Sequence, residues 1–166
     1  MSLCAQDEEY VGASQEDVYI NLEYTGCFRG SYCPRYEITI LGNGMVIYEG
    51  SNGVSKTGIV QKQIKKQQVA DLLTKVLEFR YFERKDVSSD CGGPKVDLVD
   101  GIYDYEGGRI CITSSHGPFT DINIQLGSLK RKVQLEHYFS DDYSTIHQEI
   151  ILTAGVKNLI KKPAKK

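Results

Sequence analysis

The chain has 166 residues, of which 40% are hydrophobic and 25% are charged, and its formal net charge is −2 at pH 7. This length and composition are ordinary for one globular domain with a continuous core. The pI near 5.9 provides no overall positive field, which argues against nucleic acid or an anionic membrane as the partner. No apolar run approaches the roughly 20 residues of a transmembrane helix.

Charge is unevenly placed along the chain, because the start is acidic and the end is rich in lysine. Segments of one charge sign at the ends of a domain are typically solvated tails. We therefore predict an acidic N-terminal tail over residues 1–16, a single domain over residues 17–156 and a basic C-terminal tail over residues 157–166.

The first half is predicted to form strands. Apolar and polar residues alternate over residues 18–22 and 36–40, which is the period of a strand with one face on a core. Gly42-Asn43-Gly44 supplies the positive-φ residues of a tight turn, so the pattern predicts a β-hairpin that continues to Tyr48. Residues 59–64 add a further strand.

Two amphipathic helices are predicted to pack on the sheet. Between residues 65 and 79, apolar residues recur at i, i+3, i+4, i+7 and i+8, which places them on one helical face. A second helix follows Asp141 and Asp142, which are suited to capping its first turn, and Gly155 ends it.

Strand signals return in the second half at residues 109–113, 120–126 and 132–138, with a turn at Gly127-Ser128. Both halves thus contain strands followed by an amphipathic helix. We predict an α+β domain, an antiparallel sheet with both helices on one face. The rhythm is compatible with two ββα-like halves, produced either by duplication or by chance.

Five cysteines, at positions 4, 27, 33, 91 and 111, form no C-x-x-C pair, which argues against a structural zinc site. In an oxidising compartment, a disulfide between Cys27 and Cys33, or from either to Cys91, is the favoured interpretation; in a reducing compartment they are thiols. The start, Met1-Ser2-Leu3, was either added by cloning before a lipoprotein that begins near Cys4, or is an ordinary start beside an incidental cysteine.

Several short motifs point to a known family. They are Thr25-Gly26-Cys27-Phe28, Cys33-Pro34-Arg35-Tyr36, Gly42-Asn43-Gly44 and Val46-Ile47-Tyr48-Glu49-Gly50. The chain resembles a bacterial family of domains of unknown function, often found in secreted or envelope proteins, with the pattern T-G-C-F-G-x-C-P-x-Y and a G-[DN]-G hairpin. The resemblance covers most of the chain. It implies a fold and a periplasmic, lipoprotein or extracellular location rather than a cytoplasmic one, but no activity.

One departure from that family concerns the loop between the first two cysteines of the motif. Five residues, Phe28 to Tyr32, separate Cys27 from Cys33, where the family pattern has three. A longer loop can still close a disulfide, but a site formed by the shorter loop in relatives would be altered here.

No residue pattern identifies a catalytic, metal or cofactor site. The three histidines form no H-E-x-x-H motif, and there is no phosphate-binding loop. Four carboxylates could offer oxygen ligands to calcium, but their spacing differs from that of a calcium loop, so a solvated loop is favoured. These four are Asp97, Asp100, Asp104 and Glu106.

Two functions from different classes remain. The favoured one is a non-enzymatic protein-binding module of the cell envelope or extracellular space, whose cysteine loop presents rigid aromatic and arginine anchors to a partner, in one version as a protease inhibitor. The candidate partner-binding residues are Phe28, Arg29, Tyr32 and Tyr36. The alternative is a redox or hydrolytic enzyme that uses Cys27, Cys33 or Cys91 with a histidine.

Overall fold

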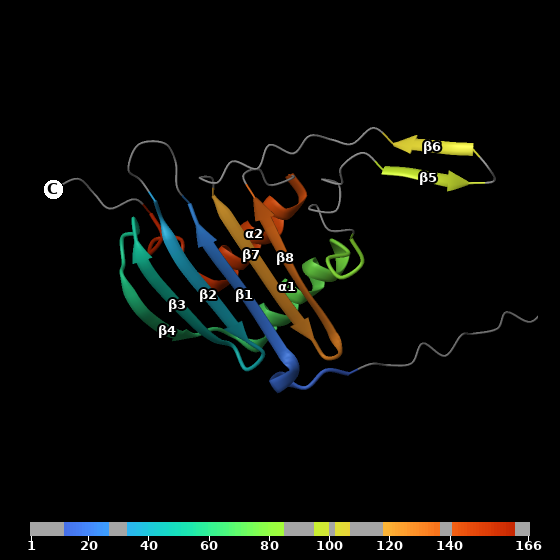
Figure 1. Ribbon diagram of the computed structural model, residues 1–166. Coiled ribbons are helices and arrows are strands. Elements are labelled where there is room, and N and C mark those ends of the chain that lie inside the picture. Colours follow the sequence, from blue (N-terminus) through green and yellow to red (C-terminus); the bar gives the residue numbers. More distant parts are fainter. Residues whose placement is uncertain are drawn as a thin grey trace, which may run out of the picture.

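The main feature of the fold is a six-stranded antiparallel sheet with the strand order β4-β3-β2-β1-β7-β8 (Figure 1). The computed structural model describes residues 12–26, 33–84, 95–99, 102–106, 118–136 and 141–161. The strands of the sheet are β1 (Val18–Thr25), β2 (Arg35–Leu41), β3 (Met45–Asn52), β4 (Gly58–Gln63), β7 (Phe119–Leu126) and β8 (Leu129–Glu136). A short 3₁₀ helix, η1 (Gln15–Asp17), leads into β1.

Two helices, α1 (Lys66–Glu78) and α2 (Asp141–Ala154), cover one face of this sheet (Figure 1). The apolar stripe predicted on the first helix is buried at Val69, Leu72, Leu73 and Val76, whereas its last member, Leu77, is 48% exposed. The predicted α+β architecture, an antiparallel sheet with two helices on one face, is therefore confirmed. The two halves contribute unequally to the main sheet, since β1 to β4 before α1 all belong to it, whereas only β7 and β8 of the strands between α1 and α2 do.

The core lies between the sheet and the helices, and the strand register aligns its apolar side chains. Ile20 stands between Ile40 on β2 and Ile124 on β7, and Leu22 is flanked in the same way by Ile38 and Ile122. All are fully buried. Burying one such side chain stabilises the fold by about 1.5–3 kcal/mol, so this layer is a main source of stability.

The predicted hairpin between β2 and β3 is confirmed, with Ile40 opposite Val46 next to the turn. Gly44 has φ +88°, and a Cβ there would lie 2.4 Å from the carbonyl oxygen of Ile64. Both the backbone angle and the close approach of β4's end therefore require glycine at this position.

A second, two-stranded sheet occupies part of the segment that was predicted to be a solvated loop. Its strands are β5 (Lys95–Val99) and β6 (Ile102–Glu106). The prediction was wrong because Val96 and Leu98 alternate with Asp97 in the period of a strand, and this local pattern outweighs the polarity of the carboxylates. Asp97 stands opposite Asp104 in this hairpin. The strand predicted at residues 109–113 lies outside the described residues.

Residues beyond position 156 still contact the domain. The backbone amide of Lys56 donates to the carbonyl of Leu159 at 3.1 Å, and the Ser55 hydroxyl donates to the carbonyl of Lys161 at 2.8 Å. The segment that begins the predicted basic tail is thus bound to the β3–β4 connection. Neither α1 nor α2, the helices in the described part of the chain, has the length and apolar character needed to span a membrane.

Candidate functional site

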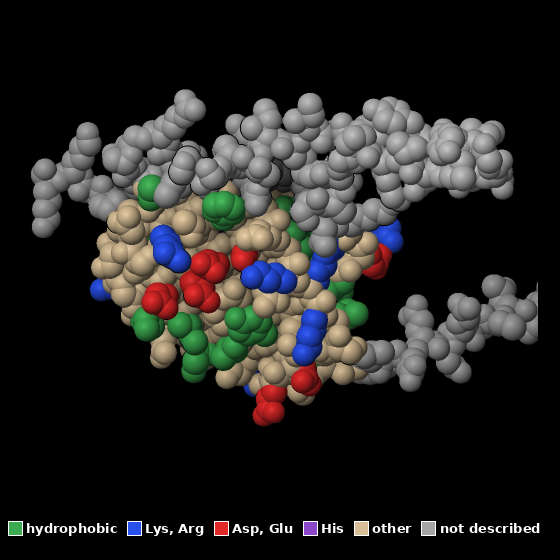
Figure 2. Space-filling model, in the orientation of Figure 1, with side chains coloured by type: hydrophobic (Ala, Val, Ile, Leu, Met, Phe, Trp, Pro, Cys, Tyr) green, Lys and Arg blue, Asp and Glu red, His purple; other side chains and the backbone are tan. Residues whose placement is uncertain are grey.

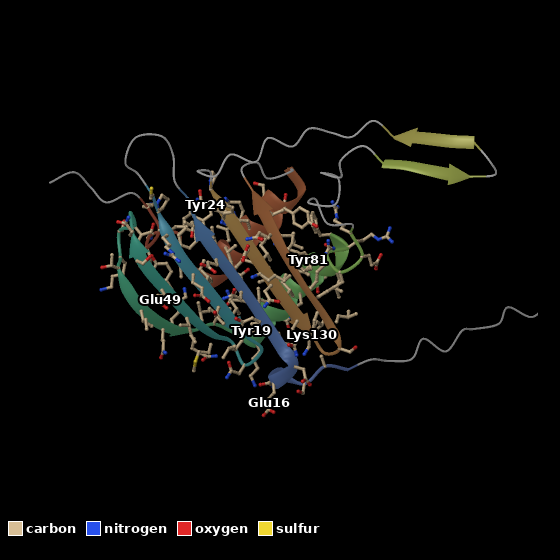
Figure 3. All side chains as sticks on the ribbon, in the orientation of Figure 1. Glu16, Tyr19, Tyr24, Glu49, Tyr81 and Lys130 are labelled. Carbon is tan, nitrogen blue, oxygen red and sulfur yellow. The ribbon has the colours of Figure 1, made fainter. Side chains whose placement is uncertain are left out.

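The candidate site lies on the other face of the six-stranded sheet, against which no helix or strand among the described residues packs (Figure 2). Side chains on this open face alternate along each strand with those of the core, so in β2 the exposed Glu37 follows the buried Tyr36. Figure 3 labels Tyr19, Glu49 and Lys130, which belong to the open face.

A row of four carboxylates crosses the open face. Glu49 on β3 is directly opposite Glu37 on β2, Glu37 is opposite Glu23 on β1, and Glu23 is opposite Asp121 on β7. We call these four residues the acidic row. Directly opposite residues have Cβ atoms about 4.5–5.5 Å apart, and like charges at that spacing destabilise a sheet.

The four carboxylates of the acidic row differ in the cations and hydrogen-bond donors that lie beside them. Asp121 forms an ion pair of 2.8 Å with Lys132, and Glu23 lies 3.8 Å from the Arg35 guanidinium. The amide of Asn21 donates to Glu37 at 2.7 Å. Among the described residues no cation pairs with Glu37 or Glu49.

The Asp121 to Lys132 pair marks one end of the row. The pKa of Lys132 is raised, first by its hydrogen bond to Asp121 and then by attraction to the same carboxylate. Lys132 thus stays charged beside Asp121. The negative charge that is left without a cation is concentrated at the other end, on β2 and β3.

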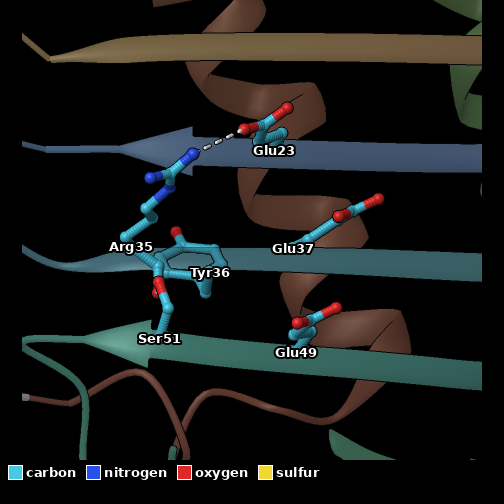
Figure 4. Close-up of a pocket in the computed structure, with 6 residues that line it drawn as sticks. All are labelled: Glu23, Arg35, Tyr36, Glu37, Glu49 and Ser51. Carbon is cyan, nitrogen blue, oxygen red and sulfur yellow. Dashed lines mark hydrogen bonds and ion pairs between the residues drawn. The ribbon is translucent and has the colours of Figure 1, made fainter. Parts of the chain in front are cut away.

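A shallow hollow lies at that end of the row, lined by side chains of three neighbouring strands (Figure 4). The carboxylates of Glu23, Glu37 and Glu49 project on the same side of the sheet, beside Arg35 and Ser51. Such a set accepts hydrogen bonds from ammonium or guanidinium groups. Among the described residues, no group of three or more His, Cys, Asp or Glu side chains is arranged to hold a metal ion.

The like charges of the row lead to a prediction about stability. Replacing Glu37 with glutamine should raise the free energy of unfolding by about 0.5 kcal/mol, because repulsion from Glu23 and Glu49 disappears while an oxygen remains for Asn21. Urea unfolding at low salt measures this change, and high salt should reduce it. A glutamine variant less stable than the parent would show that the row is not under repulsion.

A second cluster, on the covered face, joins β1, β2 and α2. The Tyr36 hydroxyl and His147 Nε2 are 3.1 Å apart, and the Tyr24 ring lies 5.2 Å from the Tyr36 ring and 5.6 Å from the His147 ring. Burial lowers the pKa of His147 to about 4, so the imidazole is neutral at pH 7. The cluster thus consists of packed rings that include a polar contact between Tyr36 and His147.

The predicted site residues fall into two groups. Cys27, Phe28, Arg29, Tyr32 and Cys91 lie outside the described residues, so their roles stay predictions. Cys33 lies among the described residues and is disulfide-bonded.

Tyr36 corrects the predicted binding loop. Its side chain is only 6% exposed, because its position on β2 places it on the covered face, where it is bound to His147. It therefore belongs to the core and is not an exposed anchor for a partner.

The acidic row was not predicted from the sequence, although the positions of two of its members gave one signal. Glu37 and Glu49 are equally distant from Asn43 at the centre of the predicted turn, and residues related in this way face each other in a hairpin. Glu23 and Asp121 carried no such signal, since long connections separate them from their neighbours in the sheet.

The chain matches a protein family over more than half of its length. Residues 18–134 match a family described as a domain of unknown function (DUF6438). The match begins at β1 and ends within β8, so it includes all four strands that carry the acidic row. No curated protein matches the chain.

Proposed function

The chain belongs to the DUF6438 family, and we propose that it is a non-enzymatic protein-binding module of the cell envelope or extracellular space that binds its partner on the open face of the six-stranded sheet. The observation that carries the proposal is the acidic row. Its carboxylates stand directly opposite one another, on a face that could have carried neutral side chains or charges of alternating sign.

Retaining that arrangement costs stability, and residues that cost stability on an accessible surface are commonly kept for function. The open face also has polar and apolar parts, as protein interfaces do. Tyr19, Leu41, Met45 and Ile47 are half-buried on the same face, beside the acidic row. In Figure 2, hydrophobic side chains gather below the acidic ones.

The proposed location is supported by the state of Cys33. Disulfides persist in oxidising compartments and are rare in the cytosol, so a bonded Cys33 favours an exported protein. The same bond leaves the redox alternative in place, since thiol–disulfide exchange proceeds through such a bond. It weakens the hydrolytic alternative at Cys33, because a disulfide sulfur is not the thiolate nucleophile that such chemistry requires. Uniformly slow alkylation of every remaining thiol would remove that alternative.

Site-specific photo-crosslinking in the cells that produce the protein tests the proposed function. A benzophenone side chain at Gln61, which is exposed on β4 and opposite Ile47, should crosslink to one protein. The same group at Ala70, which is exposed on α1 in the helical layer, is the matched control and should not capture that protein. Equal capture from both positions, or capture only from Ala70, would contradict binding on the open face.

A further inference from the structure

We infer that the partner of the open face is an extended polypeptide segment rich in lysine or arginine, which seats its cationic side chains on Glu23, Glu37 and Glu49. This inference rests on the proposed function and specifies the chemistry of the partner. Its basis is the unbalanced charge of the face together with the spacing of the carboxylates.

The charge balance of the row is incomplete at the β2–β3 end. Lys132 is committed to Asp121, and Arg35 reaches only Glu23, across 3.8 Å between two well-exposed side chains. An exposed pair at that distance is weak, so a partner cation can compete for Glu23 at little cost. Glu37 and Glu49 are both exposed and are paired with no cation among the described residues.

The spacing of the row suits an extended segment that crosses the strands. Neighbouring strands lie about 4.8 Å apart, so the three carboxylates extend over roughly 10 Å. In an extended chain, side chains at i and i+2 point the same way and are about 6.6 Å apart. Two cations at i and i+2 would therefore lie between the three carboxylates, each shared by two of them.

Apolar contacts are available beside the charges. Ile59, which is 63% exposed, stands opposite Glu49 at the end of the row, and Ile47 lies two residues before Glu49 on the same face of β3. Lysine and arginine bury their methylene stems on apolar surface while the charged head stays in water. The face thus offers both parts of such a side chain a suitable contact, which a free metal ion or an anionic ligand would not use.

Titration with a defined peptide tests the inference on the full chain. The probe is a short acetylated and amidated peptide of alternating lysine and threonine, and a peptide of alternating glutamate and threonine is its counterpart. The protein variants are Glu37→Gln/Glu49→Gln in the row and Glu78→Gln/Glu83→Gln on and just beyond α1, which remove the same charge from exposed positions.

We expect the row variant to bind the lysine peptide roughly 5-fold more weakly than the parent chain, since two exposed ion pairs are lost. The matched variant should change the Kd less than 2-fold, high salt should weaken parental binding, and the glutamate peptide should not bind. Equal losses in both variants would show attraction to net charge alone and would overturn the inference.

Two further outcomes separate this inference from the proposed function. If the parent chain forms a dimer that the row variant abolishes, the open face is occupied by a second copy that supplies cations such as Lys130, and the inferred polypeptide segment is refuted. If the protein crosslinked from Gln61 in cells is captured equally well by the row variant, the proposed function stands and the cationic partner is refuted.

Discussion

Replacing Tyr81 with alanine is expected to lower the free energy of unfolding by about 4 kcal/mol, the effect of deleting a large buried aromatic side chain. Tyr81 is fully buried just after α1, and its hydroxyl donates to the carbonyl of Ile122 on β7 at 2.7 Å. Its own carbonyl accepts a hydrogen bond from Arg131 on β8. Tyr81 therefore joins the end of the first helix to the β7–β8 side of the sheet.

Urea unfolding of the variants Tyr81→Ala and Tyr81→Phe measures this effect. The phenylalanine variant keeps the ring and loses only the hydroxyl bond, so we expect a loss of about 1 kcal/mol. Similar losses for the two variants would mean that the hydrogen bond, and not ring packing, dominates at this position. A loss below 1 kcal/mol for alanine would contradict the buried position of the ring.

Acid is expected to destabilise the domain through His147. The pKa of this residue is lowered by burial to about 4, against an ordinary value of 6.5, so the unfolded chain binds a proton that the folded chain does not bind. The contribution to stability is complete above pH 6.5 and is lost as the pH falls toward 4. The loss amounts to about 3 kcal/mol over that range.

The variant His147→Gln isolates this contribution, since glutamine retains a polar group near the Tyr36 hydroxyl and does not titrate. Unfolding of parent and variant at pH 7 and pH 4 gives two differences, and the parental one should be larger by about 3 kcal/mol. Equal differences would show that His147 is not the titrating group. The groups around His147 are Tyr24 and Tyr36, which contact the imidazole, and Lys157 and Lys161, which line the adjoining hollow.

The strands and helices of the main sheet could be predicted because local pattern and tertiary burial agree there. Alternation over residues 18–22 and 36–40 and the turn at Gly42-Asn43-Gly44 correspond to β1, β2 and the β2–β3 hairpin. The helix predicted from residues 65 to 79 matches α1 for the same reason. Periodicity indicates which face is buried, and in this domain one sheet face and one helix stripe form a single core.

The acidic row could not be predicted, because it depends on which strands are neighbours. Glu23 comes to lie between Glu37 and Asp121 only because β1 is central and pairs with β7, a strand almost a hundred residues away in the chain. Pairing across such a separation is fixed by packing of the whole core rather than by local sequence. The prediction for Tyr36 was wrong for another reason, since the alternation over residues 36–40 already places Tyr36 on the same face as Ile38 and Ile40, which is the buried face.

The most direct test of the account is to map where a cationic peptide binds on the full chain. Amide chemical shifts of the isotope-labelled protein should change, on addition of the lysine–threonine peptide, along β1, β2 and β3 around Glu23, Glu37 and Glu49. The amide chemical shifts of α1 should not change. Shift changes confined to the helices, or spread evenly over acidic positions such as Glu16 and Glu78, would contradict a docking surface on the open face of the sheet.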